Sequence, residues 1–465
     1  MMQRTDWLIY GNGLSALVLA ERLGSIGKQV VLVNPGKSWG GIFGGLNING
    51  DVFDVGMTNF EFDLFSDPAE DIQNYDPDQK RDVGRYVHFV ERYLSTFVEV
   101  LPVPTPCMRF GNHLVRDLIL SNNFDVLKVL APQARDAIRI ELEAIVAAPN
   151  PLHPRTKNDP NAPLATATFA QASLANHGKA FHGLFIEPIF RKILGIPTTQ
   201  IEAIFHRNGW APLFYPETLL SQFGPAPQVL KPTIFRYPTD ENFGLFIGRI
   251  AEKVSALPNV RLIESAKQVV IDAAEFTLRI DGEKLAFRHL AWGADPAQLL
   301  SLPHGAHPRA KRASLDIFFL RVRDEGVAHR FAVLIDSEVD SPFYRVTNQT
   351  ICSGTPSMRH KIILECNSAN WDETRPDKSA VIDAFLHRYG VDPAAVESCH
   401  RRSFTAALAI PSQAQRDEFN AQRQQILRSF PDIELIGPSS GYVSVTLNDQ
   451  IIQALKIAQR EGALE

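Results

Sequence analysis

The chain has 465 residues, of which 45% are hydrophobic and 21% charged, as expected for a globular protein with two or three domains and sizeable cores. A formal net charge of -5, without any Lys/Arg cluster interleaved with aromatic residues, argues against nucleic acid as a partner. The cysteines are scattered without metal-ligand spacing, so we expect no metal site and a reducing compartment. The sequence shows no signal-type region and no apolar run of the ~18 to 20 residues that a membrane span needs, and we therefore expect a cytoplasmic protein.

The stretch at the N-terminus has the pattern of a dinucleotide-binding unit. The apolar run Trp7–Tyr10 predicts a buried strand, and Val30–Val33 predicts a second, parallel strand after an intervening helix. Gly11 permits the tight turn between the first strand and the helix, Gly13 lets a pyrophosphate approach the backbone, and Ala16 lets the helix pack against the strand. The N-terminus of that helix offers free N–H groups and a positive dipole end to phosphates. A tight strand–helix turn without a ligand is the alternative interpretation.

A second set of glycines follows, and it is more than a nicotinamide-binding unit requires. Gly40 and Gly41 form a Gly-Gly pair, and Asp54-Val-Gly56 comes after a predicted hairpin. The order Gly-x-Gly-x-x-Ala, second strand, Gly-Gly, Phe-Asp-x-Gly resembles the flavoprotein superfamily of amine oxidases, protoporphyrinogen oxidases and UDP-galactopyranose mutases. In that superfamily the first glycines cradle the pyrophosphate of FAD, while the Gly-Gly pair and the Asp-x-Gly element approach the ribityl chain and the flavin. The resemblance therefore implies FAD as the cofactor.

Three positions differ from the pattern of those relatives. The second strand ends at Asn34, where an acidic residue usually binds the adenosine ribose. An amide can still bond ribose hydroxyls, without the strength of a charged acceptor. Ile42 replaces the arginine that commonly follows Gly-Gly, and Met57 replaces a frequent histidine. These differences predict weaker FAD binding or an altered cofactor environment.

The C-terminal segment supports the same resemblance. Ile433–Gly441 predicts a strand followed by a glycine turn, and Leu447–Leu455 predicts an amphipathic helix. In the relatives this unit returns to the FAD domain, and the helix N-terminus points at the pyrimidine ring of the flavin, where its dipole stabilises negative charge. Leu447-Asn-Asp-Gln450 is similar to a segment of UDP-galactopyranose mutases. The resemblance implies these cofactor-binding residues: Gly11, Gly13, Leu14, Ser15, Ala16, Asn34, Pro35, Gly40, Gly41, Asp54, Gly56, Met57, Gly437, Leu447, Asn448 and Gln450.

The middle of the chain is predicted to build the substrate region. Helical spacing predicts helices over 115–146, Phe169–Ile196 and Ile201–Asn208, and alternating apolar residues predict an antiparallel sheet between Ser314 and Cys366. The expected fold class is α/β, with a Rossmann-like FAD-binding domain interrupted by a helical segment and an antiparallel-sheet substrate domain. The predicted boundaries are 1–100, 235–300 and 401–465 for the discontinuous FAD domain, 101–234 for the mainly helical region, and 301–400 for the sheet domain.

Three residues of this middle region are candidate catalytic residues. Arg207 ends a predicted helix, and Tyr344 and Arg345 lie in a stretch that resembles a segment of the relatives near the flavin. The alternatives are a polar helix terminus for Arg207 and a cross-strand cation–aromatic surface pair for Tyr344 and Arg345.

The resemblance implies an FAD-dependent oxidoreductase, in which a small-molecule substrate gives a hydride from a C–N or C–C bond to the flavin. Such chemistry needs no Ser-His-Asp pattern or paired carboxylates, because the flavin accepts the hydride. One alternative is a non-redox sugar-nucleotide mutase, which would need arginines on a diphosphate, with Arg207, Arg236 and Arg345 as candidates. The other alternative is a catalytically inactive flavoprotein-fold scaffold. The oligomeric state is left open.

Overall fold

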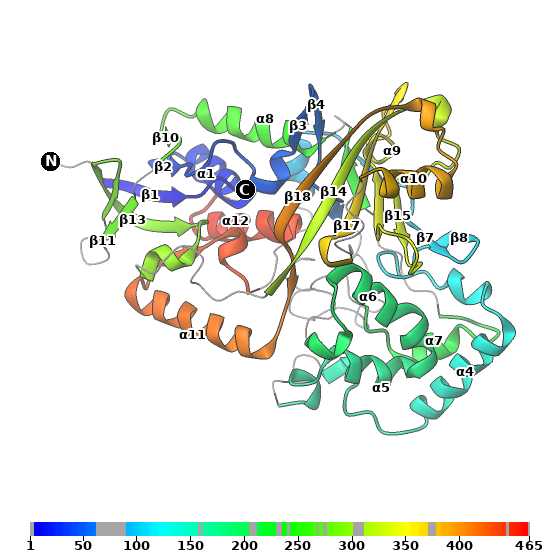
Figure 1. Cartoon of the computed structure of the whole chain (residues 1–465). Helices are drawn as coiled ribbons and strands as arrows, with labels where there is room; N and C mark the ends of the chain where they lie inside the picture. The colour runs from blue at the N-terminus through cyan, green and yellow to red at the C-terminus, as the bar shows by residue number, and fades with distance from the viewer. Residues whose placement is uncertain are drawn as a thin grey trace.

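The computed structural model describes residues 4–61, 90–156, 159, 161–203, 212–228, 235–239, 242–266, 269–272, 277–300, 311–370, 378–442 and 446–463. In these ranges the chain builds two large β-sheets, with a group of helices beside the second sheet (Figure 1). None of the helices in these ranges is long and apolar enough to cross a membrane.

The first sheet contains the predicted N-terminal unit. Its described strands run in the order β10-β2-β1-β13-β12-β11, and β19 lies beside β13. Strands β1, β2, β10, β13 and β19 pair in parallel, while β11 and β12 extend the sheet as an antiparallel meander. The bounds are β1 (Arg4–Tyr10), β2 (Val30–Val33), β10 (Val260–Ile263), β11 (Val269–Asp272), β12 (Thr277–Ile280), β13 (Glu283–Trp292) and β19 (Ile433–Leu435). Strands β1 and β2 lie in the interior of the sheet. Their residues are apolar because both faces of the sheet are covered.

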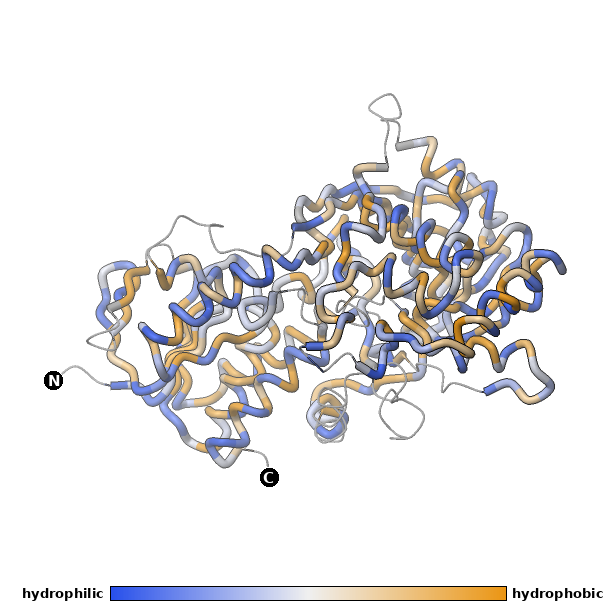
Figure 2. The backbone as a smooth tube through the Cα atoms, turned by 90° about the horizontal axis from the view of Figure 1, so that it is seen from below, coloured by the Kyte–Doolittle hydropathy of each residue, from blue (hydrophilic) through white to orange (hydrophobic). Residues whose placement is uncertain are grey.

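Helices cover this sheet on both faces. One face packs against three helices: α1 (Leu14–Ser25), α8 (Phe243–Ser255) and α12 (Leu447–Arg460). The other face packs against α11 (Gln413–Ser429) through Ile426. Segments from the start, the middle and the end of the chain therefore share one core. Hydrophobic and hydrophilic residues alternate along the helices in Figure 2, as expected for helices with one buried face.

The second sheet confirms the predicted antiparallel region and extends it. Its described strands run in the order β18-β14-β17-β16-β15-β7-β8, antiparallel except for β15 and β7. The bounds are β7 (Cys107–Phe110), β8 (His113–Arg116), β14 (Lys311–Arg323), β15 (Val333–Asp336), β16 (Arg345–Asn348), β17 (Arg359–Asn367) and β18 (Val396–Ile410). One face packs against α10 (Lys378–Tyr389), and the other faces the helical region and the first sheet. Strands β7 and β8 come from the range predicted as mainly helical.

The helical region differs from the sequence prediction in detail. It contains α4 (Pro132–Val146), α5 (Phe169–Phe181), a π-helical turn η6 (His182–Ile186), α6 (Glu187–Leu194) and α7 (Pro216–Ser221). The helix predicted over 115–146 is wrong before Pro132, because β8 and a 3-10 turn occupy that part and the proline takes the first helical turn. The helix predicted from Ile201 is wrong for its described start, and its remainder lies outside the described residues.

Two small sheets connect the larger parts. The hairpin of β3 (Leu46–Ile48) and β4 (Asp51–Phe53) leads into the Asp54–Met57 turn. A ribbon of β5 (Phe60–Glu61), β9 (Phe235–Pro238) and β6 (Val100–Pro102) then joins the beginning of the chain to its middle. This ribbon brings β9 and the start of α8 next to the turn.

Candidate functional site

The first glycine turn leaves the N-terminus of α1 open. Gly11 has a φ of +149°, and a Cβ there would lie 3.1 Å from Cα of Gly293 on the neighbouring segment, so a side chain is excluded. Gly13 is the N-cap of α1; no side chain caps the helix and no acidic residue lies in its first turn. A Cβ at Gly13 would meet nothing closer than Oε1 of Gln450, at 3.8 Å. The free N–H groups of this turn therefore face a space that suits an anion.

The second glycine turn lies beside the first. Gly40 pairs with Gly13 as a parallel bridge, and its N–H donates to the carbonyl oxygen of Asn12 at 2.7 Å. Gly40 has a φ of +88°, and a Cβ there would lie 2.6 Å from Cγ2 of Ile247 in α8. Gly41 has a φ of +58° and open space around its Cβ position. The structure thus brings the two predicted glycine turns together at one edge of the first sheet.

Asn34 directly follows β2 at the same edge, and Pro35 comes after it. It is 2% exposed, and its Oδ1 accepts the N–H of Gly36 at 2.7 Å. Within the described part of the chain, its Nδ2 has no hydrogen-bond partner. The orientation leaves an amide donor available to a ligand oxygen.

The N-terminus of α12 meets that of α1. The hydroxyl of Ser15 donates to the carbonyl oxygen of Gln450 at 2.9 Å, and a Cβ at Gly437 would lie 3.6 Å from Oε1 of Gln450. Gln450 is 4% exposed, and its side-chain amide has no hydrogen-bond partner among the described residues. Leu447 and Asn448 are also buried here. This amide, next to Gly13, is a second group suited to a ligand.

The α12 terminus also carries a group that sequence reasoning did not weigh. Thr446 and Asp449 form a capping box, in which each side chain bonds the backbone N–H of the other. The negative Asp449 carboxylate therefore partly neutralises the positive end of the α12 dipole. It weakens the stabilisation of negative charge on a flavin that the sequence predicted there.

Asp54 bonds groups of its own chain. It is 3% exposed, and its carboxylate accepts the N–H of Phe243 at 3.0 Å and the hydroxyl of Tyr237. Its own N–H donates to Oε1 of Gln349 at 3.0 Å. Burial raises the pKa of Asp54 to about 7, against the lowering effect of the Tyr237 hydrogen bond. The structure therefore places Asp54 as the residue that anchors the turn holding Gly56 and Met57.

Glu365 on β17 joins this turn to β16. Its carboxylate accepts two bonds of 2.6 Å from Nε and Nη2 of Arg345, and one of 2.9 Å from the hydroxyl of Tyr344. It also accepts the N–H of Met57 at 3.2 Å, and a Cβ at Gly56 would lie 3.0 Å from its Oε2. The structure thus brings the predicted Tyr344 and Arg345 to the predicted Gly56 and Met57.

Tyr344 and Arg345 are buried, so they are not the surface pair considered from the sequence. Burial alone would lower the pKa of Arg345, but the Glu365 carboxylate raises it above its usual value. Burial and the same carboxylate raise the pKa of the Tyr344 phenol, which stays protonated. Sequence reasoning missed Glu365. A carboxylate within the apolar strand Lys361-Ile-Ile-Leu-Glu-Cys could have indicated it, because a buried acid requires a partner.

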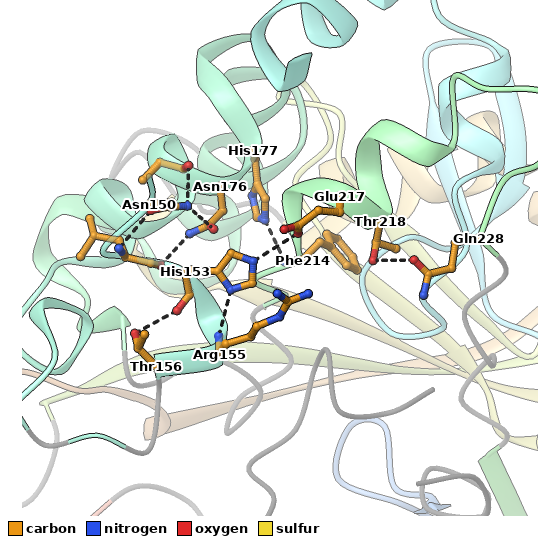
Figure 3. Close-up of polar contacts among 12 residues, drawn as sticks. Asn150, His153, Arg155, Thr156, Asn176, His177, Phe214, Glu217, Thr218 and Gln228 are labelled. Atoms are coloured by element: carbon orange, nitrogen blue, oxygen red, sulfur yellow. Dashed lines mark hydrogen bonds and ion pairs between the residues drawn. The ribbon is translucent and has the colours of Figure 1, made fainter. Parts of the chain in front are cut away.

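Arg207 lies outside the described residues. In the described part of the helical region, the N–H of Phe214 donates to Nε2 of His177 at 2.8 Å, and His153 lies 3.2 Å from Glu217 (Figure 3). Burial and the neighbouring His182 lower the pKa of His177 to about 3, so this imidazole is neutral. Arg236, the remaining candidate for a diphosphate, is half-buried on β9.

The sequence matches no protein-family model and no curated protein. The structure is similar to a reduced UDP-galactopyranose mutase, with 19% identity and a TM-score of 0.71 over 100% of this chain and 95% of that one. It is also similar to cyclohexylamine oxidase from Brevibacterium oxydans, with 14% identity and a TM-score of 0.58 over 99% of both chains. A putrescine oxidase bound to putrescine matches with 15% identity and a TM-score of 0.56, over 99% of this chain and 98% of that one.

These likenesses show the fold of the chain. The chain has the α/β fold shared by amine oxidases and UDP-galactopyranose mutases, and the predicted fold class is confirmed. The likeness extends over essentially the whole chain.

Proposed function

We propose that this protein binds FAD at the edge of the first sheet where Gly13, Gly40 and Gln450 meet. The observation that carries the proposal is the open, uncapped N-terminus of α1 beside a second glycine turn. The N–H groups of Leu14, Ser15 and Ala16 lie in the first turn of α1, which suits a pyrophosphate. The similarity to amine oxidases and a mutase supports the same cofactor.

The remaining predicted residues would contact the other parts of FAD. Asn34 and Pro35 lie at the end of β2, where the adenosine ribose would bind. Gly41, Gly56 and Met57 would contact the ribityl chain and the flavin. Four residues would lie around the pyrimidine side of the flavin: Gly437, Leu447, Asn448 and Gln450. When bound, FAD would supply the hydride acceptor.

The reaction we propose is oxidation of a small molecule at a C–N or C–C bond. Arg345 and Glu365 neutralise each other beside Met57, and the Tyr344 phenol is protonated, so these groups can orient a substrate without taking its proton. Hydride transfer to a flavin depends mainly on such orientation. The two amine oxidases with the same fold support this class of reaction.

A sugar-nucleotide mutase is the second candidate. The similarity to UDP-galactopyranose mutase, with a TM-score of 0.71 over the whole chain, favours it. This reaction would need several arginine groups on one diphosphate. Arg345 already gives two of its five guanidinium N–H groups to Glu365, and that carboxylate balances its charge, so it is poorly suited to hold a diphosphate.

The visible spectrum of freshly purified protein tests the cofactor. We expect flavin bands near ~375 and ~450 nm, bleached by dithionite and restored by air. A colourless protein that takes up no added FAD would contradict the proposal and favour an inactive scaffold. In a protein that shows the flavin bands, formation of peroxide with a panel of amines would support oxidation. Conversion of UDP-galactopyranose by the dithionite-reduced protein, and not by the oxidised protein, would support the mutase.

A further inference from the structure

Glu365 receives hydrogen bonds from two distant parts of the chain. Arg345 and Tyr344 belong to β16 in the second sheet, whereas Met57 follows the hairpin of the first part of the chain. Met57 and Glu365 are 308 positions apart in the sequence. Glu365 is 1% exposed, so its hydrogen bonds lie in a low-dielectric interior where they are strengthened.

We infer that Glu365 is a positioning residue of the candidate flavin site, which fixes Arg345 and the Gly56–Met57 turn relative to each other. The inference rests on the proposed FAD site. The bidentate pair holds the guanidinium plane of Arg345 in one orientation. The bond from the Met57 N–H to the same carboxylate then sets the turn against that plane.

The contacts of Arg345 define what this arrangement presents to a ligand. Nε and Nη2 are bound by Glu365, whereas Nη1 has, among the described residues, only Sδ of Met57 at 4.0 Å. Glu365 therefore leaves three of the five guanidinium N–H groups, two on Nη1 beside Met57 and one on Nη2, and its carboxylate balances the charge of Arg345. Because the pair is neutral overall, it suits a neutral acceptor of the flavin or the substrate better than a diphosphate.

Stability alone is a weak reason for this pair. Desolvating two charges offsets much of their attraction, so a hydrophobic pair of similar size is often as stable. What a hydrophobic pair would lack is the direction of the bonds to Tyr344, Arg345 and Met57. A positional role therefore explains the buried carboxylate better than a contribution to stability.

Glu365→Gln tests the inference in the full-length protein, with the dissociation constant of FAD and the visible circular dichroism of bound flavin as readouts. Asp316→Asn is the matched control, because Asp316 is a buried carboxylate of the same sheet that pairs with Arg401 at 3.0 Å. Its strand neighbours Phe318 and Leu320 belong to the core on the α10 side, away from the turn. Both variants should lower the melting temperature.

Only Glu365→Gln should weaken FAD binding, by about tenfold or more, which corresponds to about 1.4 kcal/mol, and change the flavin dichroism. An unchanged FAD dissociation constant and dichroism in Glu365→Gln would overturn the inference while leaving the FAD site intact. A wild-type protein without flavin would overturn the proposed function itself and, with it, the inference. If Glu365→Gln does not fold, the double variant Arg345→Met/Glu365→Gln, which leaves no unpaired charge, carries the test with the same expected loss.

Discussion

Asp54 should make the protein less stable as the pH rises from about 4 to about 7. Its carboxyl is buried beside the Gly56–Met57 turn and bonded by Tyr237 and the N–H of Phe243, and its pKa is raised by burial from 3.8 to about 7. Because the folded-state pKa lies above the unfolded value, the native state binds the proton more tightly. Its contribution to stability is fully present below about pH 4 and is lost progressively as the pH rises to about 7.

The size of the effect follows from the shift of the Asp54 pKa. Each unit corresponds to about 1.36 kcal/mol, so a rise from 3.8 to about 7 amounts to about 4 kcal/mol between the two limits. Asp54→Asn removes this term, because an amide stays neutral at every pH. An amide also has the bonding pattern of a protonated carboxyl, with an oxygen for the Phe243 N–H and a donor for the Tyr237 oxygen. The variant should therefore resemble the wild type in acid.

Urea denaturation of both proteins measures this difference. Relative to the wild type, Asp54→Asn should gain about 2 to 3 kcal/mol of unfolding free energy between about pH 5 and about pH 8. Asp51→Asn is a control on the same hairpin, because it removes only the accessible ion pair with Arg321. It should gain nothing as the pH rises. Parallel pH profiles for wild type and Asp54→Asn would refute the reasoning.

Three further substitutions test the site and its support. Gly13→Asp places a carboxylate in the open turn of α1 and should abolish FAD retention with little loss of melting temperature; full occupancy of FAD would contradict the site assignment. Asn34→Asp keeps an acceptor for the Gly36 N–H and adds a charged acceptor for a ribose hydroxyl, so FAD should bind more tightly in a titration; an unchanged or larger dissociation constant would show that this side chain does not face the ribose. Lys192→Met removes the ammonium group that donates to the carbonyl oxygens of Asp336 at 2.7 Å and Glu338 at 2.6 Å. It should lower the free energy of unfolding, measured in urea, by about 3 kcal/mol. Equal stability of the variant and the wild type would argue against a stabilising role of these buried bonds.

The elements that the sequence predicted correctly depend on neighbouring residues. The turn at Gly11 and Gly13, the strand Val30–Val33 and the helix that became α12 each follow from apolar periodicity, small residues and helix termini. The fold class followed from the flavoprotein resemblance that these motifs carry.

The errors arose where a local pattern competed with a contact from elsewhere. Apolar spacing over 115–146 continued through a stretch in which β8 instead pairs with β7 in the second sheet. In the same way, the helix predicted over Phe169–Ile196 is interrupted at Gly178, which has a φ of +78° and packs against Glu141 of α4. Strand pairing and close helix packing gain their free energy from distant segments, so periodicity in one segment does not report them.

For the candidate site, the sequence by itself determined the glycine turns, because they lie within short stretches whose geometry is set by backbone freedom and helix ends. The expectation of FAD came from the resemblance that these turns carry. Only the tertiary structure decided that Asp54 anchors its turn through Tyr237 and that Glu365 joins Arg345 to Met57. The physical reason is that a buried polar group must find a partner, and the partner is whichever group the folded chain brings within reach.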